Sequence, residues 1–347
     1  MSEFYIINST QVKTYMNMEE LIPEIEMAYR LKATKEGGVF PVITHEWIEG
    51  IKDMDIKSGY IDGDVSIYGL KALTYIEENQ EKGLPCLTGT MLVFDSQTGR
   101  LKGVLDSGEI TGFRTGAAGG IGSKYLARQD SKNLLLVGAG KQAFSNLASN
   151  LLVMDGLEHI TVCDPVNPQG AEQFIDGLKD RLLNEIFIKA APVQKDKLNF
   201  TCEAVPLEGL KPAVMAADII ITVTPARSPI VKDEWIKEGV HINCIGSDMV
   251  GKEEIEKEIF ARARVIVDDI NQAVSIGETE IPVKQGIIKQ EDIVSEIGQI
   301  IVGQKKGRLS DKDITIFDTS GLALQDLMSA EYLLKKAEDA GQNKNSI

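Results

Sequence analysis

The stretch Leu134-Leu135-Leu136-Val137-Gly138-Ala139-Gly140-Lys141-Gln142-Ala143 places a glycine-rich turn directly after a short apolar run. A strand, a G-x-G-x-x-A turn and a helix in this order form a dinucleotide site. Gly138 would make the tight turn, Gly140 would let backbone amides approach a pyrophosphate, and Ala143 would let the helix lie close to the strand. We expect the phosphates at the helix N-terminus, where unpaired N–H groups and the helix dipole favour anions.

The residues that follow supply the context that this motif needs. Apolar residues recur at helical spacing from Phe144 to Leu152, and the next apolar run, His159–Cys163, ends at Asp164. An acidic side chain at the tip of the second strand can accept hydrogen bonds from ribose hydroxyls. Because residues 165–167 offer no arginine for a 2′-phosphate, the sequence predicts NAD rather than NADP as cofactor. The alternative is a glycine turn in an α/β domain that binds no nucleotide.

The composition is that of a globular, acidic chain. Its 347 residues, 43% of them hydrophobic, suffice for two domains with sizeable cores. The formal charge of −15 argues against nucleic-acid and acidic-membrane partners, since phosphate binding relies on clustered Lys and Arg. The sequence shows no signal peptide or membrane-spanning run, so we expect a cytoplasmic protein. The four cysteines are scattered and no histidine stands at ligand spacing, which predicts buried reduced thiols and no metal site.

Before the glycine-rich motif, the pattern predicts a helix, a group of strands and a second helix. The first helix begins with the capping pattern Asn17–Glu20 and ends before Gly37-Gly38. The second helix carries Arg114 and many glycines, which lower helix propensity unless another backbone must approach closely. Between them, strands with short connections, and therefore antiparallel neighbours, are predicted at Val65–Tyr75, Leu87–Phe94 and Leu101–Leu105.

From Leu134 onward, apolar runs alternate with segments of helix length, which predicts a parallel, doubly wound sheet. A last helix from about Leu322 to Ala340 could return to the first domain. Beyond Leu134–Val137, the predicted strands of this part are Ile160–Cys163, Phe200–Val205, Ile219–Val223, His241–Ile245, Val265–Val267 and Ile314–Phe317.

Three separated motifs resemble the ornithine cyclodeaminase/μ-crystallin family, and its archaeal-type alanine dehydrogenase branch in particular. They are Arg114–Gly120 with Lys124–Ala127, His241–Asp248 with Gly251-Lys252, and Ile314–Ala323. The resemblance implies an α/β fold in which a Rossmann doubly wound parallel sheet is inserted into a discontinuous α+β catalytic and dimerisation domain. The boundaries would be 1–115 plus 312–347 for the substrate-binding and dimerisation domain and 116–311 for the NAD-binding domain. It also implies a homodimer.

Lys71 lies inside the apolar strand Gly69–Leu73. Burial of an ammonium is costly unless it is paired, and desolvation lowers its pKa toward the range of proton exchange. From the residues alone, an edge lysine whose amine reaches solvent explains the pattern better. The resemblance reverses this preference, because the family's catalytic lysine lies at this place, before Lys82–Pro85.

Arg114 opens the glycine-rich helix in our prediction, where its guanidinium and the helix N-terminus would both attract an anion. Its planar fork suits a bidentate grip on a carboxylate, although a structural or phosphate-side ion pair is the alternative. The resemblance implies that Arg114 binds the carboxylate of the amino-acid substrate.

Asp248 lies just past a strand, at an edge where α/β sheets place their sites. It could instead cap a helix that begins near Gly251. The resemblance implies a general acid or base that faces the substrate's amino group.

The remaining expected site residues concern the cofactor and a second cation. Family members usually carry a further carboxylate-binding cation before the lysine-bearing strand; here Gly37–Pro41 is followed by a divergent stretch with His45, Lys52 and Lys57, so the sequence does not identify it. Glu253, Glu254, Glu256 and Glu258 are predicted to form a solvated helical face. The predicted cofactor-binding residues, some of which could be ordinary strand-end turns, are Thr115, Gly138, Gly140, Gln142, Ala143, Asp164, Thr222, Val223, Thr224, Ser320 and Gly321.

Together these residues predict an NAD-dependent enzyme that acts at the Cα of an L-amino acid through an imine, as in oxidative deamination of alanine. Lys71 would polarise the imine or activate water, and Asp248 would transfer protons. Cyclisation of ornithine to proline and reduction of cyclic ketimines need the same groups. A μ-crystallin-like protein that binds a nicotinamide cofactor and a small ligand without turnover is the non-enzyme alternative.

Overall fold

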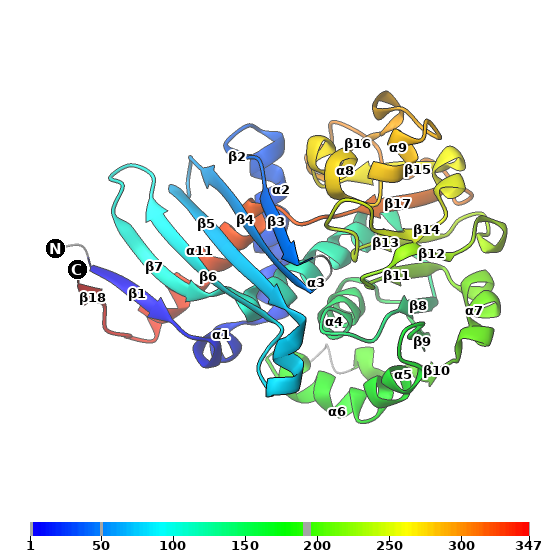
Figure 1. Cartoon of the computed structure of the whole chain (residues 1–347), viewed down its shortest axis with the longest axis horizontal. Helices are drawn as coiled ribbons and strands as arrows, with labels where there is room; N and C mark the ends of the chain where they lie inside the picture. The colour runs from blue at the N-terminus through cyan, green and yellow to red at the C-terminus, as the bar shows by residue number, and fades with distance from the viewer. Residues whose placement is uncertain (1–2, 49–50, 190–195, 347) are drawn as a thin grey trace. The chain divides into compact units, whose positions relative to one another are not determined.

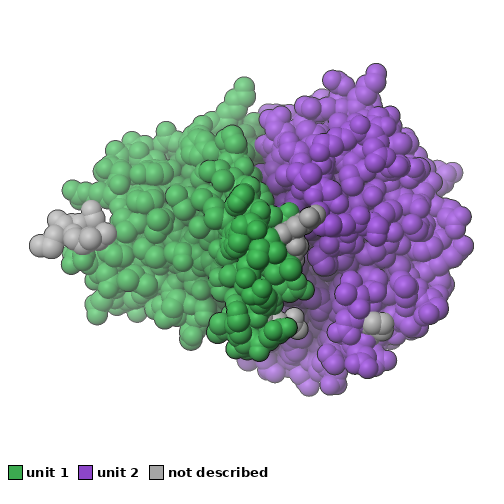
Figure 2. Space-filling view, viewed as in Figure 1, with its two compact units in different colours: residues 1–16, 23–114, 322–347 green, residues 17–22, 115–321 purple. Residues whose placement is uncertain are grey.

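A computed structural model describes residues 3–48, 51–189 and 196–346. The chain divides into two compact units (Figure 2): unit 1 comprises residues 1–16, 23–114 and 322–347, and unit 2 comprises 17–22 and 115–321. Within the described residues, no helix is long and apolar enough to cross a membrane.

Unit 1 is built on a mainly antiparallel sheet (Figure 1). Its strands follow the order β18-β1-β7-β6-β5-β4-β2, with β3 paired to β4, and only the β1–β7 pairing among these is parallel. The predicted antiparallel pairing of the strands around Lys71 is confirmed. The strand bounds are β1 (Glu3–Ile7), β2 (Gly37–Val39), β3 (Ile43–Ile48), β4 (Lys52–Ile61), β5 (Ile67–Ile76), β6 (Leu87–Asp95), β7 (Leu101–Asp106) and β18 (Asn345–Ser346).

The C-terminal helix α11 (Ala323–Asp339) packs on one face of this sheet (Figure 1). Glycines in the strands let the helix lie close: a Cβ on Gly69 would stand 3.1 Å from Leu327, and one on Gly59 would stand 3.3 Å from Leu324. The last helix therefore returns to the first part of the chain, which brings residues from both ends of the sequence onto one sheet face. The other helices with residues in this unit are α1 (Ser9–Tyr15), α2 (Met18–Ala33) and α3 (Ser107–Leu126).

Unit 2 contains a parallel sheet in the order β10-β9-β8-β11-β13-β17-β15-β16. Its central strands are buried and mostly apolar, as expected for parallel strands covered on both faces. A short parallel pair joins β12 (Arg227–Val231) and β14 (Glu253–Ile255). The strands of the main sheet are β8 (Asn133–Val137), β9 (His159–Cys163), β10 (Thr201–Ala204), β11 (Ile219–Thr222), β13 (His241–Cys244), β15 (Ala263–Val267), β16 (Ser295–Glu296) and β17 (Ile314–Asp318).

Helices connect these strands, and the predicted doubly wound Rossmann class is confirmed by their order (Figure 1). The glycines of α3 meet the neighbouring helix: a Cβ on Gly116 would stand 2.4 Å from the Ser145 carbonyl oxygen, and one on Gly120 would stand 2.9 Å from Ser149. Close backbone approach is therefore the reason for the glycine content. The helices are α4 (Ala143–Val153), α5 (Pro168–Ile175), α6 (Leu178–Leu182), α7 (Leu210–Ala216), α8 (Ile270–Ile276), α9 (Glu280–Lys284) and α10 (Ile297–Ile301).

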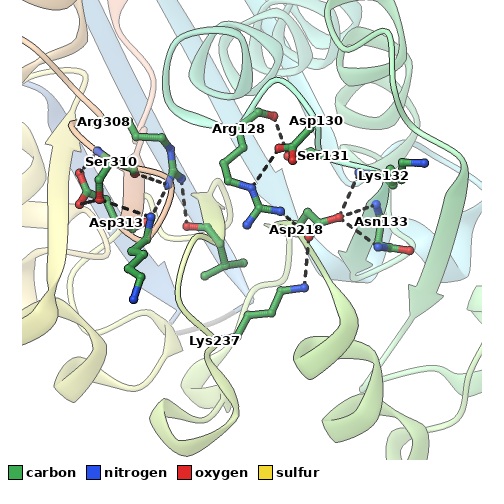
Figure 3. Close-up of polar contacts among 12 residues, drawn as sticks. Arg128, Asp130, Ser131, Lys132, Asn133, Asp218, Lys237, Arg308, Ser310 and Asp313 are labelled. Atoms are coloured by element: carbon green, nitrogen blue, oxygen red, sulfur yellow. Dashed lines mark hydrogen bonds and ion pairs between the residues drawn. The ribbon is translucent and has the colours of Figure 1, made fainter.

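A network of charges ties the amino ends of the unit 2 strands around Asp218 (Figure 3). One Asp218 oxygen accepts hydrogen bonds from the backbone N–H groups of Lys132 and Asn133, each at 3.0 Å. The other lies 3.1 Å from both Arg128 and Lys237. Burial alone would raise the pKa of Asp218, but these hydrogen bonds and the Lys237 charge lower it to about 2. Asp218 is therefore ionised at neutral pH and joins β8 to β11.

The structure corrects several sequence predictions. Residues 312–321 were predicted in the first domain, but β17 is hydrogen-bonded between β13 and β15, which groups them with unit 2. All four cysteines are free, yet only Cys163 and Cys244 are buried; Cys86 and Cys202 are half-buried. Cys202 lies on β10, at the edge of its sheet, and an apolar run does not show which strand will be at the edge.

Candidate functional site

The glycine-rich turn in unit 2 has the geometry of a dinucleotide site. Gly138 follows β8 with a φ of 102°, a conformation that side chains rarely adopt. A Cβ there would stand 2.9 Å from the Val223 carbonyl oxygen, whereas a Cβ on Gly140 would meet nothing within 4 Å. No side chain caps α4 after Gln142, so the first turn of the helix remains available to an anion. The tight turn, the open space and the uncapped helix fit a bound pyrophosphate.

Asp164 lies at the end of β9, beside this turn. It is half-buried, and one of its carboxylate oxygens accepts the N–H of Ala139 at 3.1 Å. The other accepts the N–H groups of Val166 and Asn167 at 3.0 and 2.9 Å. These bonds fix the carboxylate next to the glycine turn, and carboxylate oxygens have further lone pairs for ribose hydroxyls.

Two other predicted cofactor segments follow the carboxyl ends of β11 and β17. Thr222 and Thr224 are buried and both donate to Glu254. Ser320 and Gly321 are held by the side-chain amide of Gln272, which donates 2.9 Å hydrogen bonds to the Ser320 hydroxyl and the Gly321 carbonyl. Thr115, in α3, is also buried. Contacts within unit 2 thus order each segment.

The predicted solvated acidic helix at Glu253–Glu258 is wrong. Residues Glu253–Ile255 form strand β14, and the Glu254 side chain is completely buried. Glu278, also buried, accepts the N–H groups of Glu254 and Ile255 at 2.7 and 2.8 Å. Four closely spaced glutamates suggest a solvent-exposed surface. The sequence does not show that one of them, Glu254, faces the ends of neighbouring strands.

Asp248 is in the loop after β13, with a side chain that is 47% exposed. It forms an ion pair with Lys252 at 2.6 Å. The alternative role as a helix cap is wrong, because the element that follows Gly251 is strand β14. Asp248 belongs to unit 2, whereas Lys71 and Arg114 belong to unit 1.

Lys71 is the centre of a charged cluster inside unit 1. It lies on β5 with a side chain that has no exposed surface, so the alternative of an amine that reaches solvent is wrong. Its ammonium donates to Asp326 of α11 at 2.9 Å and to the Thr111 hydroxyl at 3.4 Å. Desolvation lowers the pKa of Lys71 to about 8, with help from the charges of Arg114 and Lys57 and against the attraction of Asp326. This lysine can therefore exchange a proton near neutral pH.

Arg114 lies in the same cluster, but not where the sequence predicted it. Helix α3 begins at Ser107, so Arg114 lies well inside the helix and gains nothing from its N-terminus. Its Nη1 donates to Gln325 at 3.2 Å, and its Nε stands 3.3 Å from Asp326. Burial would raise the pKa of Asp326, but the charges of Lys71 and Arg114 keep it lowered. The first turn of α11 thus holds both cations.

The cluster contains polar atoms that its own residues do not satisfy. Arg114 Nε and Asp326 Oδ2 are buried and have no hydrogen-bond partner. Buried polar atoms normally find partners, since an unsatisfied one costs about 1–3 kcal/mol. The N–H of Arg114 Nε, close to the Lys71 ammonium, is a donor that an anionic ligand could use.

Of the three residues that the sequence left open as a second cation, Lys57 lies nearest to Lys71 in the sheet pairing. It is opposite Lys71 in the β4–β5 pairing and is only 4% exposed. His45 is exposed on β3, and Lys52 pairs with Glu78 at 2.9 Å. Antiparallel register, which places Lys57 and Lys71 on one face, could have identified Lys57 once both strands were known.

The sequence analysis also missed Asp326 and Gln325. Both are buried polar residues in the first turn of α11. In the sequence they stand out only as an amide and a carboxylate among the apolar residues of the final helix. That pattern does not indicate that they contact Lys71 and Arg114. Among the described residues, no group of three or more His, Cys, Asp or Glu side chains could hold a metal ion.

Comparisons with known proteins identify the family of this chain. The model of the ornithine cyclodeaminase/mu-crystallin family matches residues 3–341. Alanine dehydrogenase of Archaeoglobus fulgidus is 35% identical over 96% of this chain and 95% of its own length. An archaeal alanine dehydrogenase dimer with bound NAD superposes with a TM-score of 0.88 at 33% identity, with 99% of each chain covered. The Δ1-pyrroline-2-carboxylate reductase of Thermococcus litoralis, in complex with NADH and L-proline, gives a TM-score of 0.87 at 29% identity, with both chains fully covered.

Proposed function

Because the chain belongs to the ornithine cyclodeaminase/mu-crystallin family, we propose that it is an NAD-dependent oxidoreductase acting at the Cα of an L-amino acid through an imine. The observation that carries this proposal is the buried Lys71, held by Asp326 with Arg114 and Lys57 beside it. When bound, the nicotinamide would accept hydride from Cα or return it. The solved structures of relatives with NAD or NADH bound support this use of a nicotinamide cofactor.

Arg114 and Lys57 would bind the substrate carboxylate. The unsatisfied Nε of Arg114 offers one donor, and the guanidinium is already oriented by Gln325. Arg114 and Lys57, both buried beside Lys71, would together attract one carboxylate.

Lys71 would exchange the proton that the reaction requires at the substrate nitrogen or at an attacking water. A pKa of about 8 leaves both protonation states accessible, and Asp326 holds the amine in place. Asp248, which is exposed and paired to Lys252, would be the second proton-transfer group.

We propose NAD as the cofactor. Asp164, fixed beside the glycine turn, would accept hydrogen bonds from the adenosine ribose and repel a 2′-phosphate. Gly138, Gly140, Gln142 and Ala143 would surround the pyrophosphate, while Thr115, Thr222–Thr224 and Ser320-Gly321 would line the rest. We place the protein in the cytoplasm, where NAD and free amino acids are found.

The fate of the imine decides the net reaction. Hydrolysis would give an alanine-dehydrogenase-type deamination, which the Archaeoglobus fulgidus relative supports. Reduction of a cyclic imine is supported equally by the Thermococcus litoralis relative. Cyclodeamination of ornithine remains a further alternative, and a μ-crystallin-like binding protein is the non-enzyme alternative. The buried Lys71 argues against the last, since ligand binding alone does not require a lysine with a lowered pKa.

We also propose a homodimer formed through unit 1. An aromatic row crosses the sheet on the face that lacks Lys71: Phe40 stacks on Tyr60 at 6.0 Å, and Tyr68 stacks on Phe94 at 5.0 Å. Tyr60 and Tyr68 are paired across β4 and β5, and both are more than a third exposed. A second copy would cover this face, and the dimeric archaeal relative supports that arrangement.

An NADH-absorbance assay tests the function. Alanine, ornithine and lysine are offered with NAD, and cyclic imines and pyruvate plus ammonia are offered with NADH, with product identification. We expect turnover of at least one of these amino acids or imines, with a higher rate with NAD than with NADP. Tight NAD binding without turnover of any of these would instead support the binding protein.

A further inference from the structure

Glu254 is a buried carboxylate that has no role in the mechanism above. Its side chain in β14 is fully buried and accepts hydrogen bonds from four donors. One oxygen accepts the Thr224 N–H at 2.6 Å and the Thr224 hydroxyl at 2.8 Å. The other accepts the Thr222 hydroxyl at 2.7 Å and the Gly246 N–H at 2.8 Å. A single side chain therefore joins the segments that leave β11 and β13.

These segments carry residues of the proposed site. A Cβ on Gly138 would stand 2.9 Å from the Val223 carbonyl oxygen, so the Thr222–Thr224 segment packs directly against the glycine turn. Gly246 is two residues before Asp248 and packs on Thr224, because a Cβ there would stand 2.1 Å from the Thr224 carbonyl oxygen. Small displacements of either segment would thus change the glycine turn and the loop of Asp248.

All four donors are uncharged, so these hydrogen bonds to the buried carboxylate include none from a lysine or arginine. Two of them are backbone N–H groups that can only donate, so both oxygens of Glu254 must accept. Burial raises the pKa of Glu254, while the hydrogen bonds from Thr222, Thr224 and Gly246 oppose that rise. Glu278 holds the other side of the same strand by accepting the N–H groups of Glu254 and Ile255. The Glu254 carboxylate is therefore held by its four donors, and the backbone of its strand is held by Glu278.

We propose that Glu254 is a positioning residue that holds the Thr222–Thr224 and Gly246–Asp248 segments in the geometry that NAD binding and proton transfer by Asp248 require. This inference rests on the proposed function. Glu254 touches neither substrate nor cofactor in this role; it acts through the two segments that it joins.

The isosteric variant Glu254→Gln tests the proposal. Whichever way its amide turns, the NH2 group faces a backbone N–H, that of Thr224 or that of Gly246. One segment must then move. We expect the Kd for NAD, measured by direct titration of folded protein, to rise about 10- to 100-fold, with a fall in kcat. Thr222→Val, which removes one hydroxyl donor and keeps the carboxylate, should shift both values in the same direction by less, and it substitutes if Glu254→Gln does not fold.

Asp218→Asn is the matched control. Asp218 accepts backbone hydrogen bonds at the amino end of β11, and Glu254 accepts a backbone hydrogen bond just past the carboxyl end of the same strand. The control should lower the Tm and leave the Kd for NAD and kcat unchanged. The inference is overturned if Glu254→Gln keeps both values, or if Asp218→Asn changes them equally. Unmutated protein that binds no NAD would instead refute the proposed function, and the inference with it.

Discussion

The charged clusters around Lys71 and Asp218 differ in how completely their atoms are paired. In unit 2, Asp218 collects backbone N–H groups, Arg128 and Lys237, and both of its oxygens have partners (Figure 3). In unit 1, Lys71 and Asp326 are almost completely buried, and Asp326 Oδ2 and Arg114 Nε have no hydrogen-bond partner, although Nε stands 3.3 Å from the other Asp326 oxygen. The first arrangement lowers a carboxyl pKa to about 2, and the second lowers an amine pKa to about 8. Hydrogen bonds and a neighbouring charge keep Asp218 ionised, whereas burial of the Lys71 amine brings its pKa into the range where it can exchange a proton.

The largest effect should come from Lys71→Met, which removes the charge and keeps the apolar stem. We expect kcat to fall about 100- to 10,000-fold, the usual contribution of a general acid or base, and the Tm to fall because the buried Asp326 loses its ion-pair partner. Steady-state kinetics and thermal unfolding measure both. Near-normal turnover by folded Lys71→Met protein would make this cluster as structural as the Asp218 network.

Lys57→Met should chiefly weaken substrate binding. Loss of a charged donor to the carboxylate should raise KM about 10- to 100-fold, while the Kd for NAD stays unchanged. Lys52→Met, on the same strand but paired to Glu78, is the control and should keep the KM of the unmutated enzyme. Equal effects of the two variants would remove Lys57 from the site.

The pH profile should report Lys71. In the oxidative direction the neutral amine is required, so kcat/KM should rise as pH increases through about 8. In the reductive direction the ammonium is required, so kcat/KM should fall over the same range. The value of kcat/KM should be measured in both directions between about pH 6 and about pH 10, with Lys71→Met protein as the control. Identical profiles in the two directions would assign the titration to another group.

The smallest effect should be that of Asp218 on acid stability. Its pKa is lowered in the folded state from 3.8 to about 2, so its contribution is present above pH 3.8 and is lost as pH falls through about 2. After allowance for solvent screening this is about 1–2 kcal/mol of unfolding free energy. Urea unfolding of Asp218→Asn and unmutated protein at pH 7 should show this difference, and at pH 2 the two should converge. A constant gap would contradict the assignment.

The sequence predicted those parts of the molecule that depend on local pattern. The Gly138 turn, each strand-to-helix step and the acidic tip at Asp164 depend on a few consecutive residues, and the predicted strands lie where the pattern placed them. Strands β1 to β4, β12, β14, β16 and β18 were not predicted. Lys71 was singled out because a lysine in an apolar strand is anomalous by itself. The family resemblance added the proposed roles of both Lys71 and Arg114.

The parts that depend on contacts distant in sequence were missed. Asp326 reaches Lys71 across 255 positions, and Glu254 reaches Thr222 across 32. The start of α3 at Ser107 was missed because glycine content hid the first turns of the helix, which moved Arg114 from its predicted helix end. Lys57 could not be chosen among three candidates until strand register placed it opposite Lys71.

The central claim is that hydride passes directly between the substrate Cα and the nicotinamide, in a reaction that needs Lys71. The most direct measurement uses the amino acid that supports NADH formation, deuterated at Cα, with mass analysis of the NADH produced. The account predicts that the deuterium appears in the reduced nicotinamide and that Lys71→Met forms almost none. Unlabelled NADH, with the deuterium released to water, would contradict direct transfer from Cα.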